Sequence, residues 1–314
     1  MNIVSVSRRT DIPAFYAPWF MNRVRAGFAY SVNPYNPKQV RRIGLSSSEV
    51  ACLVFWSKNP APLLPHLDEL DALGHRYYFQ LTLTGLGGAL EPHVPSVSET
   101  LAVMERLSAK VGPGRVLWRF DPICLAEEAQ DAQLIATFDR LSRRLEGVTR
   151  RVTVSFLDLQ AQVKKRLLKA GQGHLVDPAL LAPQQTASRL GPLLAALKEM
   201  AAGRGMELAA CAPKLDLTPF GVRSAPCIDG ELMERLFSLK LGRSRDRYQR
   251  PACRCLPTVD LGSYGSCPHG CLYCYGSCDN ALRRGRRHDP KNPWLLEPET
   301  RNEPDQRELW SDPS

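Results

Sequence analysis

The sequence lacks any long apolar run. None of its hydrophobic stretches approaches the ~20 residues that a helix needs to cross a bilayer. The N-terminus also lacks the apolar core of a signal peptide, because Asp11 and Pro13 follow a Ser7-Arg8-Arg9 segment that only superficially resembles a twin-arginine signal. These two absences predict a cytoplasmic protein without a membrane-spanning segment.

Nucleotide-binding signatures are missing as well. No G-x-G-x-x-G or Walker segment follows any expected strand, which argues against the nucleotide-binding version of an α/β fold. The net charge of +9 is compatible with nucleic-acid binding. Much of that charge lies in short clusters, however, which are typical of solvated helix faces. Nucleic-acid binding is therefore an alternative that the sequence does not favour.

The 314 residues do contain an alternation of short β-rich runs and amphipathic stretches. The expected strands are residues 3–6, 28–32, 51–56, 76–83, 115–120, 151–156, 206–211 and, more weakly, 258–261. Several are apolar almost throughout, as buried parallel strands are. About eight strands alternating with helices predict an α/β fold, a TIM-like (β/α) barrel with a C-terminal cysteine-rich loop. An open doubly wound sheet is the alternative.

Polar side chains follow almost every expected strand. Each alone is more typical of a helix cap or a turn, but in a barrel the carboxyl ends of the strands converge on the active-site mouth. Arg119 precedes Asp121 by two residues, so both side chains point to the same side of a strand and could form an ion pair. The candidate catalytic residues are Arg9, Asp11, Lys58, Arg119 and Asp121.

A cysteine triplet with the spacing C-x3-C-x2-C lies near the C-terminus: Cys267, Cys271 and Cys274. Three thiolates can bind three irons of a [4Fe–4S] cluster and leave the fourth iron open. An open coordination position distinguishes a reactive metal site from a structural one. A structural zinc site is the alternative, although zinc sites usually show paired C-x2-C knuckles.

The remaining cysteines raise the question of a second site. Ten cysteines in a cytosolic protein point to metal or redox chemistry more than to disulfides. Four of them could form a second zinc or iron–sulfur site: Cys211, Cys227, Cys253 and Cys255. For Cys211 the alternative is a small hydrophobic residue at the end of a buried strand. Cys278 or Cys255 could also serve as a fourth ligand that closes the first cluster.

The triplet, with Tyr273 before its last cysteine, resembles the cluster-binding loop of radical S-adenosylmethionine (SAM) enzymes. In that family the open iron chelates SAM, and its reductive cleavage yields a 5′-deoxyadenosyl radical. The resemblance implies a [4Fe–4S] cluster on Cys267, Cys271 and Cys274, with Tyr273 beside the adenine. It also implies an electron donor such as a flavodoxin or ferredoxin. We expect Arg8 and Asn33, which follow two of the expected strands, to contribute to cofactor binding.

The whole chain also resembles a bacterial family known as domain of unknown function 1848. The matching segments are residues 5–13, 33–38, 54–60, 118–122 and 264–275. They predict one domain over residues 1–280, which includes the cysteine-rich segment 253–278. Residues 281–314 are basic and then polar, which is typical of a flexible tail.

The leading hypothesis is a radical-SAM-like iron–sulfur enzyme of unknown substrate. The polar strand ends favour an enzyme over two other classes. One is a non-enzymatic metal-binding or redox-sensing protein with a structural iron–sulfur or zinc site. The other is a nucleic-acid-binding module. Fold alone does not decide among these classes.

Overall fold

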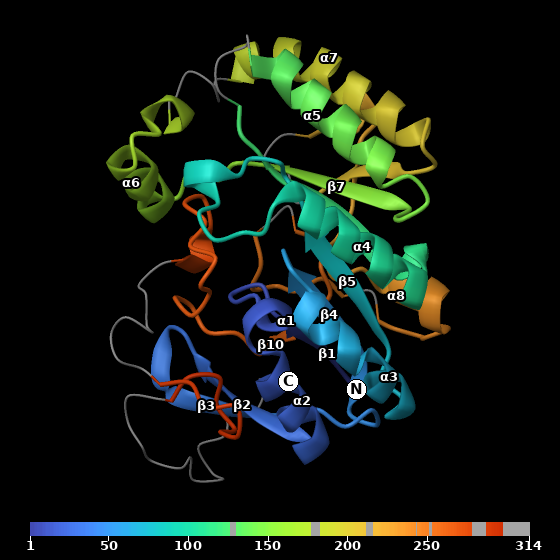
Figure 1. Cartoon of the computed structure of the whole chain (residues 1–314), viewed down its shortest axis with the longest axis vertical. Coiled ribbons are helices and arrows are strands. Elements are labelled where there is room, and N and C mark those ends of the chain that lie inside the picture. The colour runs from blue at the N-terminus through green and yellow to red at the C-terminus, as the bar shows by residue number, and fades with distance from the viewer. Residues whose placement is uncertain are drawn as a thin grey trace. The chain divides into compact units, whose positions relative to one another are not determined.

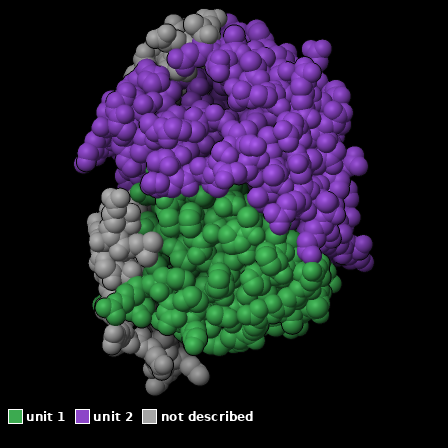
Figure 2. Space-filling view, in the orientation of Figure 1, with its two compact units in different colours: residues 1–78, 258–270, 276–314 green, residues 79–257, 271–275 purple. Residues whose placement is uncertain are grey.

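The computed structural model of the chain describes residues 1–125, 130–176, 183–211, 216–242, 244–250, 253–277 and 287–297 (Figure 1). The chain divides into two compact units, shown in Figure 2. Unit 1 comprises residues 1–78, 258–270 and 276–314, and unit 2 comprises residues 79–257 and 271–275. The single domain expected over residues 1–280 stays a prediction. Cys267 belongs to unit 1, and Cys271 and Cys274 belong to unit 2.

An eight-stranded, mostly parallel sheet has the strand order β10-β1-β4-β5-β6-β7-β8-β9. Its strands are β1 (Asn2–Val6), β4 (Val50–Ser57), β5 (Tyr77–Thr82), β6 (Val116–Ile123), β7 (Arg151–Phe156), β8 (Glu207–Ala210), β9 (Arg223–Ser224) and β10 (Val259–Asp260). The order follows the chain from β1 to β9, and β10 lies on the other side of β1. The α/β class is confirmed. A closed barrel, in which β9 would pair with β10, is not shown among the described residues.

Among its described residues, unit 1 contains β10, β1, β4 and the start of β5, together with three short helices. The helices are α1 (Ile12–Phe15), α2 (Ala17–Ala26) and α3 (Leu67–Ala72). Strand β4 is buried along nearly its whole length, which explains its apolar sequence. Helix α2 packs against it through Phe20, whose ring meets Phe55 edge to face at 5.4 Å.

The expected strand at residues 28–32 does not join the main sheet. Strand β2 (Phe28–Asn33) pairs antiparallel with β3 (Asn36–Gly44) in a separate two-stranded sheet. The connection is a tight turn in which the Tyr35 N–H donates to Asn33 Oδ1 at 2.9 Å. Asn33 therefore lies at the end of β2, beside the hairpin turn, and not at the end of a strand of the main sheet. Its expected role in cofactor binding stays a prediction.

The structure describes only part of the tail expected over residues 281–314. Residues 287–297 pack within unit 1, with Leu295 and Leu296 buried. The Trp294 ring lies 4.9 Å from that of Tyr30, and the Trp19 indole N–H donates to the Asn292 carbonyl at 2.9 Å. These apolar side chains bury enough surface to order a segment that is otherwise polar. Cys278, residues 281–286 and residues 298–314 lie outside the described part of the chain.

Unit 2 contains the rest of β5, strands β6 to β9 and five helices among its described residues. The helices are α4 (Val97–Val111), α5 (Asp131–Arg144), α6 (Ala161–Lys169), α7 (Pro183–Ala202) and α8 (Gly230–Phe237). Helix α4 begins with a capping box between Ser96 and Glu99. Trp118 of β6 stacks on Phe138 of α5 at 5.0 Å. In the part of the chain that the structure describes, no helix is both long and apolar enough to span a membrane.

Candidate functional site

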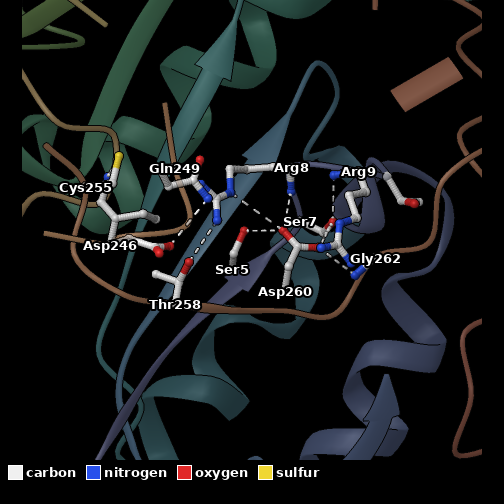
Figure 3. Close-up of polar contacts among 12 residues, drawn as sticks. Ser5, Ser7, Arg8, Arg9, Asp246, Gln249, Cys255, Thr258, Asp260 and Gly262 are labelled. Carbon is white, nitrogen blue, oxygen red and sulfur yellow. Dashed lines mark hydrogen bonds and ion pairs between the residues drawn. The ribbon is translucent and has the colours of Figure 1, made fainter. Parts of the chain in front are cut away.

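Asp260, at the end of β10, is the centre of a buried hydrogen-bond network in unit 1 (Figure 3). Its carboxylate accepts from Ser5 Oγ at 2.8 Å and from Ser7 Oγ at 2.6 Å. It also accepts from the backbone N–H groups of Arg8 at 2.9 Å and Gly262 at 2.8 Å. Four donors fix the carboxylate and join the end of β10 to the end of β1.

Asp11 forms a second anchor of the same kind, just beyond the end of β1. Its two oxygens accept from Ser57 Oγ at 2.7 Å, Lys58 N at 2.7 Å, Ala14 N at 3.0 Å and His269 Nε2 at 2.9 Å. Because a carboxylate only accepts, Nε2 of His269 carries the proton. Asp11 is thus the N-cap of α1 and also joins the end of β4 to the segment that carries Cys267.

The segment 260–270 therefore lies along the carboxyl ends of β1 and β4. Thr10 Oγ1 donates to the Ser263 carbonyl at 2.7 Å, and Tyr16 donates to the Ser266 carbonyl at 2.5 Å. Burial, and then the neighbouring Cys267 thiolate, raises the pKa of Tyr16. Cys267 is consequently held beside residues that follow the first strand of the sheet.

The basic residues proposed for this edge are already engaged. Arg8 donates through its guanidinium to Thr258 Oγ1 at 2.9 Å and lies 3.9 Å from Asp260 (Figure 3). The Arg9 guanidinium lies over the Tyr264 ring at 5.1 Å. The backbone N–H of Lys58 donates to Asp11. The structure thus brings Arg8, Arg9, Asp11 and Lys58 to one edge of unit 1.

Two residues central to this edge were missed by sequence reasoning. Asp260 lies in a two-residue strand, too short for a clear β pattern. His269 lies inside the triplet; it is buried, and its ring lies 4.6 Å from that of Phe15. The available signal was the type of residue. A histidine between two candidate metal ligands and an aspartate at a strand end both need a polar partner when they are buried.

The other part of the cysteine loop (residues 267–274) belongs to unit 2. Tyr273 donates its hydroxyl to the buried carboxylate of Glu91, and Arg166 donates to the carbonyls of Leu272, at 3.1 Å, and Cys274. Burial, and then the neighbouring Cys271 thiolate, raises the pKa of Tyr273 well above its ordinary value. These contacts hold Cys271 and Cys274 on a fixed backbone.

Changing Tyr273 to Phe is expected to lower the free energy of unfolding by about 1 to 2 kcal/mol, because buried Glu91 loses a hydrogen bond to its charged form. Glu91 still accepts hydrogen bonds from Thr84 Oγ1 at 3.0 Å and from Gly87 N at 3.2 Å. The loss of stability should therefore be smaller than that for a buried charge without any partner. Urea unfolding measures the change. The exposed Tyr35→Phe variant is the control, and equal stabilities of the two variants would contradict this role for Tyr273.

In unit 2 the expected ion pair between Arg119 and Asp121 is present, and Arg119 is buried. Its second partner was not foreseen: Nη1 donates to Cys227 Sγ at 3.0 Å. Two of the four cysteines proposed as a second site, Cys211 and Cys227, are neighbours of this pair. Arg119 and Asp121 thus belong to unit 2, and a single cavity that also includes Arg9, Asp11 and Lys58 stays a prediction.

The donor types at the triplet match an iron–sulfur cluster, since three cysteines supply three thiolates. Cys267 and Cys274 are half-buried and Cys271 is buried. Across the described residues, however, no three His, Cys, Asp or Glu side chains already surround a common point as metal ligands. The triplet therefore matches an iron–sulfur site in its ligand type and in its sequence spacing.

These features define an α/β protein with a mostly parallel sheet and buried carboxylate anchors at its strand ends. The chain belongs to the family described as Domain of unknown function (DUF1848), whose model matches residues 3–276. This confirms the family resemblance seen in the sequence. Neither the search of curated proteins nor the search of solved structures found a match.

Proposed function

We propose that this protein is an iron–sulfur enzyme whose cysteine loop binds a [4Fe–4S] cluster through Cys267, Cys271 and Cys274. One observation carries the proposal: His269, inside the loop, is hydrogen-bonded at 2.9 Å to Asp11 at the carboxyl end of β1. In parallel α/β sheets that edge is where active sites form. A buried histidine–carboxylate hydrogen bond therefore holds the cysteine segment at this edge.

The chain's own residues have a clear part in this proposal. Asp11 and His269 hold the unit 1 half of the loop, while Glu91 and Arg166 hold the unit 2 half. Such anchors orient metal ligands as outer-shell partners do in other metal sites. A cluster bound with one open iron would supply one-electron chemistry to a chelating ligand such as SAM.

The experiment is anaerobic purification and reconstitution, followed by iron and acid-labile sulfide analysis. Wild type should bind about four irons per chain, and Cys267→Ala, Cys271→Ala and Cys274→Ala should each lose most of them. Cys52→Ala, in buried strand β4, is the matched control and should keep its iron. Reconstituted wild type without iron, or iron that persists in the triplet variants, would overturn the proposal.

SAM use is tested separately on the same protein. SAM should change the EPR signal of the dithionite-reduced cluster, and turnover should release 5′-deoxyadenosine. The triplet variants should release none. An unchanged EPR signal together with no 5′-deoxyadenosine would leave a cluster without radical-SAM chemistry.

In the second candidate function, the protein is not an enzyme, and its metal site serves to stabilise the fold. One observation favours it: Asp11 and Asp260 each accept four hydrogen bonds from the protein itself. Carboxylates saturated in this way act as structural anchors more readily than as proton-transfer groups. Iron binding without any effect of SAM is the outcome that would select this function.

A further inference from the structure

Four cysteines of unit 2, which we call the four-cysteine cluster, meet although they come from three separate segments. Cys211 directly follows β8, Cys227 follows β9, and Cys253 and Cys255 lie in the segment 253–257. The Sγ atoms of Cys211 and Cys227 are 2.8 Å apart. Cys255 lies beside both Cys227 and Cys253, and the N–H of Ile228, the residue after Cys227, donates to Cys255 Sγ at 3.5 Å. The four cysteines are thus neighbours, although among the described residues no three ligand side chains already surround a common metal position.

This grouping differs from ordinary packing of cysteine as a small apolar side chain. Cys52 illustrates ordinary packing, because it is fully buried in β4 and its thiol donates to the Leu53 carbonyl at 3.5 Å. In the four-cysteine cluster the thiols instead contact one another. Thiols are weak donors and acceptors, so such contacts stabilise little by themselves. Thiolates on a shared metal ion, in contrast, contribute strongly to folding.

The surroundings of the cluster suit negatively charged sulfur. The buried Arg119 guanidinium donates to Cys227 Sγ at 3.0 Å, and the Ile228 N–H donates to Cys255 Sγ at 3.5 Å. A metal-bound thiolate is a much better acceptor for a guanidinium than a neutral thiol is. Four thiolates around a divalent ion carry a net charge of about −2, and Arg119 offsets part of it.

The spacing of the sulfurs distinguishes a single ion from an iron–sulfur cube. Tetrahedral zinc with Zn–S bonds of ~2.3 Å places its sulfurs ~3.8 Å apart. A cube holds its thiolates much farther apart, because each binds a different iron. The 2.8 Å contact between Cys211 and Cys227 needs to open by only about 1 Å to fit one ion.

We infer that Cys211, Cys227, Cys253 and Cys255 form a tetrathiolate site for a single zinc ion. The ion would join the segments after β8 and β9 to the segment 253–257. The backbone of that segment is also held by a hydrogen bond from the Asp246 N–H to the Cys255 carbonyl at 2.8 Å (Figure 3). The site is structural, because four protein ligands leave no open position. It is independent of the cluster proposed at the triplet.

The test is metal analysis of the full-length chain and its variants. Wild type should contain about one zinc per chain, and Cys227→Ser and Cys255→Ser should each lose it. The matched controls are Cys267→Ala and Cys52→Ala, which should keep the zinc. Loss of iron only in the triplet variants and of zinc only in the cluster variants would separate this inference from the proposed function.

A second measurement does not depend on how well the variants fold. Co²⁺ added to wild type depleted of metal with a chelator should give the absorption of tetrahedral thiolate coordination, and zinc should abolish it. Zinc should also raise the melting temperature of wild type but not of Cys255→Ser. Three results would overturn the inference: no thiolate absorption with Co²⁺, a Cys211–Cys227 disulfide in the purified protein, or iron at these cysteines in place of zinc.

Discussion

Replacing Asp260 with Ala is expected to lower the free energy of unfolding by about 3 to 5 kcal/mol, the usual cost of removing one partner from a buried charged network. The change would leave two serine hydroxyls and two backbone N–H groups of the network without their acceptor. It would also remove the carboxylate beside the Arg8 guanidinium. Each unsatisfied buried donor adds about 1 to 3 kcal/mol at most, and the effects are not additive.

Urea unfolding followed by circular dichroism measures this loss. Asp260→Asn keeps the size of the side chain and one carbonyl acceptor, so it should fall between wild type and Asp260→Ala. The exposed Asp71→Ala, in helix α3, is the matched control and should stay within about 0.5 kcal/mol of wild type. If Asp260→Ala behaved like Asp71→Ala, water and not the protein would satisfy the donors around Asp260.

Gly262→Ala should lower the free energy of unfolding by about 2 to 4 kcal/mol through overpacking and a lost hydrogen bond. A Cβ atom at this position would lie 1.9 Å from Ser7 Oγ, 2.8 Å from Ser7 Cβ and 3.1 Å from Asp260 Oδ1. Rotating the Ser7 side chain away would break its 2.6 Å hydrogen bond to Asp260 and would still leave the Cβ contact.

The matched control for this prediction is Gly242→Ala, since a Cβ there meets nothing within 4 Å. Its stability should be close to that of wild type in the same unfolding experiment. A further comparison is Gly262→Ala combined with Ser7→Ala. Because both changes act on one contact, the double variant should lose less than the sum of the single losses. Strictly additive losses would refute a direct clash between the two positions.

The stability predictions and the proposal of an iron–sulfur cluster concern residues at the same edge of unit 1. If Asp260 and Gly262 are structural, their variants should weaken folding while iron per folded chain stays unchanged. If Asp11 and His269 orient the cysteine loop, then His269→Gln should lower iron content with a smaller loss of stability. The contrast between the two sets separates the anchors of the fold from those of the proposed cluster.

Local sequence patterns were sufficient for much of the fold. Strands β1, β4, β6 and β7 overlap closely with the expected ranges, because buried parallel strands are recognisable as short apolar runs. Helix α4 is also encoded locally, since its apolar stripe and its capping box both depend on residues close in sequence. The pairing of Arg119 with Asp121 followed from the two-residue period of a strand.

Only the tertiary structure decided which residues meet across long sequence separations. Asp260 reaches Ser5 and Ser7 across about 250 residues, and no periodicity encodes such a contact. Likewise, the sequence by itself determined that four cysteines were candidates for a second site, but only the ends of β8 and β9 place Cys211 and Cys227 in contact. The hairpin at Asn33 and the packing of Trp294 were decided in the same way, because burial depends on what lies opposite a side chain and not on its sequence neighbours.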